Sequence, residues 1–94
     1  MLIIAGYLIV NAEDRDRYVA DSSSVVEQAR KAPGCLDFAL TADILDPARV
    51  NIYERWATDD ELEAFRETGP DDTAADRIVE AAVRKYRISS TESP

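Results

Sequence analysis

One stretch, residues 50–69, constrains the fold most, because a strand passes directly into a helix within it. Its first seven residues are rich in β-branched and aromatic types, which is typical of a strand. One face of that strand carries Val50, Ile52, Glu54 and Trp56. Thr58 and Glu61 then form a capping box that opens an amphipathic helix. This passage from strand to helix predicts that Trp56, the only tryptophan, lies where a sheet meets a layer of helices. There it either lines a pocket or fills the core.

The chain before this stretch alternates between strand and helix patterns. Residues 2–10 form a nearly continuous apolar run, as in a central strand covered on both faces. Residues 12–31 carry an apolar stripe at helical spacing, which predicts one long helix that ends at Ala32-Pro33-Gly34. A second strand over residues 35–43 should pair with the strand that starts at Val50 as an antiparallel hairpin, because only a short turn joins them.

The C-terminal part predicts a helical segment and a last strand. Residues 69–71, Gly-Pro-Asp, interrupt the helix that Thr58 opens. Four apolar residues then recur at helical spacing, namely Ala75, Ile78, Val79 and Ala82. This spacing predicts helix beyond a cap at Asp71 or Asp72. Residues 84–90 alternate as in a fourth strand.

The resulting order, βαββαβ, predicts an α+β protein with a ferredoxin-like fold as a single domain over residues 1–94. Such a fold is a four-stranded antiparallel sheet with helices on one face. The other face would expose a patch that includes Tyr7, Ile9, Tyr53 and Arg55. A patch of this size usually meets another subunit, so we expect a homodimer with two sheets packed face to face.

Charge and missing residue types exclude several functions. Nineteen acidic residues against eleven basic ones give a net charge of -8, so neither nucleic acid nor an anionic membrane is an expected partner. The chain has no histidine, which excludes a Ser-His-Asp triad and His-ligated zinc or haem iron, and no cluster has metal-ligand spacing. Cys35 is the single cysteine, and the N-terminal apolar run is too short to span a bilayer. We therefore expect a cytoplasmic protein without a metal or a disulfide.

Three groups of residues resemble the signature of the antibiotic biosynthesis monooxygenase (ABM) superfamily. They are residues 32–38 (Ala-Pro-Gly-Cys-Leu-Asp-Phe), residues 53–56 (Tyr-Glu-Arg-Trp), and Thr58 with Glu61, Leu62 and Ala64. The resemblance covers essentially the whole chain and implies a dimeric α+β barrel with a pocket between sheet and helices in each subunit. Characterised members include cofactor-free oxygenases of anthrone or hydroquinone rings and haem-degrading enzymes. In both, a tryptophan at the position of Trp56 lines the pocket, which favours that role here.

Two departures from the family pattern limit which of these activities and cofactors we expect. Members commonly carry a histidine nine residues after the tryptophan, where this chain has Phe65. The haem-degrading branch needs a histidine to hold iron, so no haem and no other cofactor is expected. The polyketide oxygenases often carry an asparagine four residues before the tryptophan, where Ile52 stands. Asn51 is predicted on the opposite face, so the asparagine role is not carried over.

The predicted site contains two catalytic residues, Trp56 and Glu54. Glu54 is the candidate general base because partial burial would raise the pKa of its carboxyl group; alternatively, it pairs with an arginine such as Arg84. The predicted substrate-binding residues are Phe38, Leu40, Ile52, Phe65 and Tyr86. Tyr86 would hydrogen-bond a substrate oxygen, whereas the four apolar residues could equally form a sealed core.

The predicted function is oxidation of an aromatic polyketide, anthrone or hydroquinone-like small molecule with O2 by a cofactor-independent monooxygenase. Without a flavin or metal, the substrate must itself supply an electron to O2, and an electron-rich phenol or anthrone can do so once it is deprotonated. One alternative is a non-catalytic or stress-related dimer that binds a small molecule. Another is an isomerase or lyase built on the same barrel.

Overall fold

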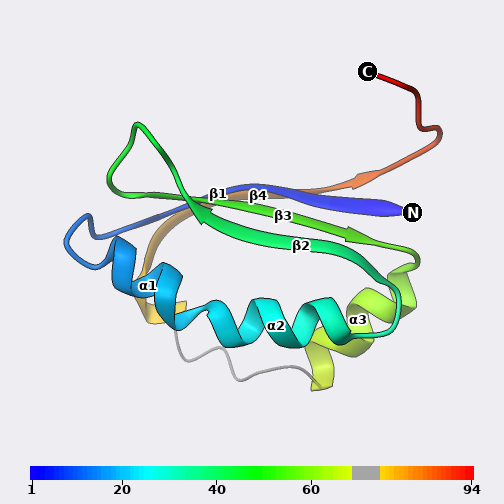
Figure 1. Ribbon diagram of the computed structural model, residues 1–94, viewed down its shortest axis with the longest axis horizontal. Helices are drawn as coiled ribbons and strands as arrows, with labels where there is room; N and C mark the ends of the chain where they lie inside the picture. Colours follow the sequence, from blue (N-terminus) through cyan, green and yellow to red (C-terminus); the bar gives the residue numbers. More distant parts are fainter. Residues whose placement is uncertain (69–74) are drawn as a thin grey trace.

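The computed structural model describes residues 1–68 and 75–94, and in them one antiparallel sheet is covered by helices on one face (Figure 1). The strands are β1 (Leu2–Val10), β2 (Cys35–Ala42), β3 (Arg49–Trp56) and β4 (Ile78–Arg87), in the spatial order β2-β3-β1-β4. The helices are α1 (Arg15–Asp21), α2 (Ser23–Lys31), α3 (Asp59–Thr68) and the short 3-10 helix η1 (Ala75–Arg77). This arrangement confirms the predicted ferredoxin-like α+β fold. None of the helices in residues 1–68 and 75–94 is long and apolar enough to cross a membrane.

The single helix predicted over residues 12–31 is divided into α1 and α2 at Ser22. The Ser22 hydroxyl donates a 2.8 Å hydrogen bond to the carbonyl oxygen of Tyr18, and the Ser22 amide donates to both Tyr18 and Val19. A serine that bonds back to the preceding turn competes with regular helix geometry and bends the chain. The break lets α1 and α2 follow the twisted sheet as two shorter helices.

The helix predicted around Ala75 to Ala82 is wrong, because all of these residues beyond η1 belong to β4. Residues 78–87 pair antiparallel with β1 along its whole length. Without this strand, β1 would present an unpaired edge, and β-branched residues such as Ile78 and Val79 suit a strand better than a helix. Tertiary pairing therefore overrides the local helical spacing. The predicted break at residues 69–71 and caps at Asp71 or Asp72 lie outside the described residues.

The predicted hairpin of β2 and β3 is confirmed, with one irregularity at its start. Its register shifts between Cys35 and Asp37, so Leu36 is bulged outward and is 47% exposed. Phe38 and Leu40 still point toward the helices, as their alternation predicts. Leu36 is therefore not among the side chains that pack under the helices.

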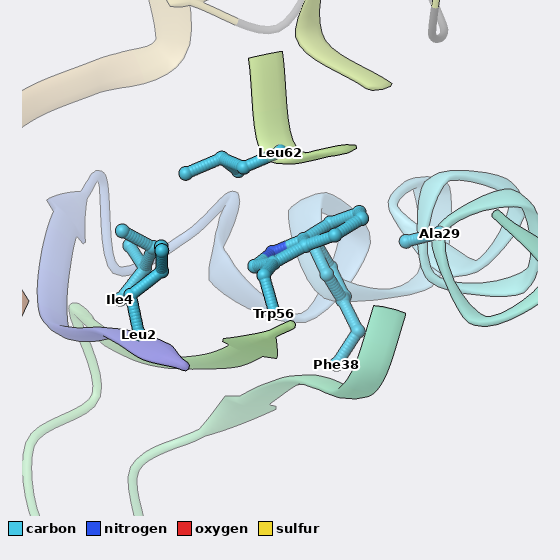
Figure 2. Close-up of a cluster of buried hydrophobic side chains, with 6 residues drawn as sticks. All are labelled: Leu2, Ile4, Ala29, Phe38, Trp56 and Leu62. Carbon is cyan, nitrogen blue, oxygen red and sulfur yellow. The ribbon is translucent and has the colours of Figure 1, made fainter. Parts of the chain in front are cut away.

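The sheet and the helices meet around Trp56, whose side chain is fully buried. Figure 2 shows the indole surrounded by side chains of α3, β1, β2 and α2, namely Leu62, Leu2, Ile4, Phe38 and Ala29. The predicted capping box starts α3, since the Glu61 amide donates to the Thr58 hydroxyl at 3.2 Å. It therefore fixes the direction in which α3 leaves β3 and closes over the tryptophan.

The opposite face of the sheet is left open by the described part of the chain, because α1, α2 and α3 all lie on the other side (Figure 1). One row across this face places Tyr86 beside Ile3 and Ile3 beside Arg55. In the next rows, Tyr53 and Tyr7 lie on the same face. The Nε atom of Arg55 is buried there without a hydrogen-bond partner among the described residues.

Candidate functional site

A cavity of about 830 Å³ lies between the sheet and the helices. The strands contribute apolar walls, including Leu8, Phe38, Leu40 and Ile52. The helices contribute Val25 and Phe65, together with a polar end made by Tyr18, Ser22 and Arg77. A volume of this order accommodates a multi-ring organic molecule, and the mixture of apolar walls with a few polar groups is typical of small-molecule sites.

Five of the seven predicted site residues line this cavity. They are Phe38, Leu40, Ile52, Glu54 and Phe65. All but Phe65 come from β2 and β3, because alternation places every second residue of each strand on the side of the helices. Phe65 reaches the cavity from α3, where it packs edge to face on Phe38 with ring centroids 6.2 Å apart.

Glu54 is a partly buried carboxylate that faces these apolar walls. Its Oε1 atom accepts a 3.0 Å hydrogen bond from the indole Nε1 of Trp56. Burial raises the pKa of the Glu54 carboxyl group above its ordinary value, while the Trp56 hydrogen bond and the charge of Arg66 oppose this rise. The alternative pairing with Arg84 does not occur, since Arg84 lies beside Ala5 on the open face of the sheet.

Trp56 lies behind the cavity, not in its wall. Its side chain has no exposed surface and packs against the ring of Phe65 at 5.4 Å between centroids. The structure therefore gives Trp56 contact with Glu54 but not with the cavity itself. In this position the indole can orient the carboxylate of Glu54, and its hydrogen bond lowers the pKa of that group.

Tyr86 and Asn51 lie away from the cavity, on the open face. Tyr86 is 50% exposed and pairs with Ile3, so its hydroxyl cannot reach a molecule bound on the helix side. Asn51 bonds to its neighbours there, accepting from Arg49 at 2.7 Å and donating to Asp43 at 2.9 Å. The expectation that Asn51 points away from the pocket is therefore met.

Sequence reasoning missed the polar end of the cavity. Arg77 of η1 donates two hydrogen bonds to Asp14, at 2.7 and 2.8 Å, and one to Asp21 at 3.0 Å. The arginine joins residues that are more than 50 positions apart in the chain, so no local pattern marks it. Ser22 and Tyr18 lie at helical spacing within the predicted helix over residues 12–31, so its apolar stripe could have indicated them. Among residues 1–68 and 75–94, no group of three or more His, Cys, Asp or Glu side chains could hold a metal ion.

A ferredoxin-like sheet with an apolar cavity under its helices defines a class of small α+β proteins that bind small molecules. The sequence matches the antibiotic biosynthesis monooxygenase (ABM) family over residues 1–87, so the chain belongs to that family. Comparison with curated proteins gives no match. The family signature predicted from the residues is thus confirmed.

Solved structures share the fold of this chain. A proposed antibiotic biosynthesis monooxygenase from Nitrosomonas europaea is 24% identical, with a TM-score of 0.81, and the match covers 96% of this chain and all of that one. A similarly described protein from Deinococcus radiodurans is 17% identical with a TM-score of 0.78, covering 100% of this chain and 98% of that one. At these identities the likeness shows the fold and not the substrate.

The exclusion of haem as a partner is wrong for proteins of this fold. The haem degrader MhuD from Mycobacterium tuberculosis is 14% identical with a TM-score of 0.69, and the match covers 99% of this chain and all of that one. Its structure holds two haems in the active site. The sequence argument considered only histidine as an iron ligand, whereas cysteine, methionine and tyrosine also ligate haem iron and an apolar pocket contributes to holding the porphyrin. The absence of histidine therefore does not rule out this ligand class.

Proposed function

We propose that this protein is a monooxygenase that oxidises a small electron-rich aromatic molecule with O2, with the electrons supplied by the substrate itself. The observation that carries the proposal is the carboxylate of Glu54, which faces an apolar cavity of about 830 Å³ and whose pKa burial raises. A base of this kind is stronger than an exposed carboxylate, and its task is to ionise a weakly acidic phenol or anthrone. Family membership supports the reaction class.

The reaction begins when Glu54 removes a proton from an anthrone-type ring methylene. The resulting enolate transfers one electron to O2, and the radical pair combines to form a C–O bond. Glu54 returns its proton to the distal oxygen, giving a hydroperoxide. The apolar walls, including Ile52 and Phe65, exclude water from these charged species.

The second half of the reaction breaks the O–O bond. Glu54 removes the remaining methylene proton, the C–H electrons form the ketone, and hydroxide leaves as water with the proton from Glu54. The methylene carbon loses four electrons and O2 gains four, so one oxygen atom enters the product and the other enters water. No external reductant is required for this balance.

Oxygen uptake with a panel of anthrones and hydroquinones tests this function. For an anthrone, we expect one O2 consumed per ketone formed, without release of hydrogen peroxide, and label from ¹⁸O2 in the product. Ile52→Trp, which fills the cavity, should abolish uptake without unfolding the protein. Substrate binding without uptake would contradict the proposal and favour the non-catalytic binding protein. Product formed equally fast under nitrogen would instead favour the isomerase or lyase.

We propose further that two copies pack through their open sheet faces. The half-buried aromatic and aliphatic side chains of that face, with the orphaned Nε of Arg55, would gain partners there. An apolar face that no described element covers usually marks such an interface. Analytical ultracentrifugation should give twice the 10.5 kDa chain mass. A monomer at micromolar concentration would contradict this part of the proposal and leave the chemistry of the cavity unaffected.

A further inference from the structure

Two arginines line the cavity within the described part of the chain, and they differ in what they already bind. Arg77 donates three hydrogen bonds to the carboxylates of Asp14 and Asp21. These two acidic groups more than balance its single positive charge. Arg77 is therefore a structural cation at the polar end and has little charge left for a bound molecule.

Arg66, in contrast to Arg77, is only weakly paired with acidic side chains. It follows Phe65 on α3, lines the cavity, and has one ion pair within the described residues, with Glu63, at 3.5 Å between Nη1 and Oε1. Both side chains of that pair are about half exposed, at 50% and 55%, so the pair is weak and easily exchanged. A guanidinium has five N–H donors in a planar fork, and this pair engages few of them. Arg66 can therefore bind an anion in the cavity that it lines.

Arg66 and Glu54 line the same cavity and interact through their charges. The charge of Arg66, which follows Phe65 on α3, stabilises the ionised form of Glu54. When Glu54 takes a proton from a bound molecule, the negative charge moves from the carboxylate to that molecule. The positive charge of Arg66 then compensates the new anion. Arg66 therefore offsets one negative charge both before and after the proton transfer.

We propose that Arg66 stabilises the oxyanion that the substrate acquires when Glu54 takes its proton. The inference rests on the proposed function and specifies its substrates: fused aromatic molecules that place an acidic hydroxyl or ring methylene at Glu54 and the oxygen that becomes anionic at Arg66. The apolar rings would lie against Phe38, Leu40 and Ile52. Molecules with the same rings but no oxygen that can become anionic would bind without being activated.

A coloured probe tests the oxyanion site without requiring turnover. The probe is 2-hydroxyanthraquinone, which is already oxidised and changes its absorption spectrum on ionisation. In the wild-type protein we expect the pKa of the bound hydroxyl group to fall by at least about one unit relative to Arg66→Gln, a tenfold change in the ionisation equilibrium. Arg66→Lys should keep part of the shift, because it keeps the charge but not the fork.

A matched control removes one positive charge elsewhere. Arg17 is exposed and does not line the cavity, so Arg17→Gln should leave the pKa of the bound probe unchanged. An equal probe pKa in wild type and Arg66→Gln, or no binding of the probe to the wild type, would overturn the inference. Oxygen uptake that depends on Glu54 but not on Arg66 would overturn it and leave the proposed function standing. A shift that depends on Arg66, without uptake of oxygen, would support the oxyanion site and reject the oxygenase.

Discussion

Replacement of Glu54 by glutamine is expected to lower kcat for oxygen uptake by about 10²- to 10⁴-fold, the contribution typical of a positioned general base. The amide cannot accept the substrate proton, but its oxygen can still accept the hydrogen bond from Trp56, so the shape of the cavity is retained. Binding of an oxidised product analogue should change little. Stopped-flow oxygen consumption and a binding titration measure the two effects separately.

The pH dependence of stability provides the control for this substitution. Because the pKa of Glu54 is raised above its ordinary value of 4.5 in the folded protein, its contribution to stability is fully present below that value. The contribution is lost as the pH rises through the folded pKa. The wild type should therefore lose stability relative to Glu54→Gln over this window in urea denaturation. Unchanged oxygen uptake in the variant, or a stability difference that does not vary with pH, would contradict the assigned role.

Replacement of Trp56 by alanine is expected to destabilise the fold by about 3–5 kcal/mol, as for other large aromatic residues in protein cores. The side chain is completely buried and is enclosed by residues from β1, β2, α2 and α3. Domains of this size are stable by only about 5–15 kcal/mol, so the loss is a large share of the total. Thermal unfolding followed by circular dichroism should show a decrease in Tm of roughly 12 °C or more.

The Trp56→Phe variant separates the contribution of Trp56 to core packing from its effect on Glu54. The phenyl ring retains part of the buried apolar contact, so the loss of stability should be clearly smaller than in the alanine variant. The hydrogen bond to Glu54 disappears, and because this bond lowers the pKa of Glu54, the acidic limb of the pH–rate profile, where activity rises as Glu54 ionises, should shift to higher pH. A pH–rate profile identical to the wild type would show that the indole contributes only to the core.

The fold could be predicted from the sequence wherever local signals agreed with tertiary pairing. The capping box at Thr58, the break after Lys31 and the alternation of β3 were all read correctly. The segment around Val79 was misread, because its apolar spacing fits a helix while its pairing with β1 is invisible in the local pattern. Helical periodicity in a short segment cannot distinguish a helix from a strand when the segment can pair with the free edge of a central strand.

The candidate site was predictable where it depends on alternation within one strand. Ile52 and Glu54 face the cavity for that reason. The extent of burial of a side chain could not be predicted in this way. Trp56 lies on the same face as Glu54, and yet α3 covers it completely. The two arginines at the cavity could not be predicted, because Arg66 and Arg77 reach it through helix orientation and through contacts between segments distant in the sequence.

The central place of β1 has a consequence for how the chain acquires its structure. This strand is made before both of its neighbours, and its residues pair with Arg49–Trp56 on one side and Ile78–Arg87 on the other. Contacts between such distant segments slow folding, because a long loop must close before they form. During synthesis, the edge of β1 that pairs with β4 therefore stays open after β3 has been made, and the nascent chain is most prone to aggregate in that interval.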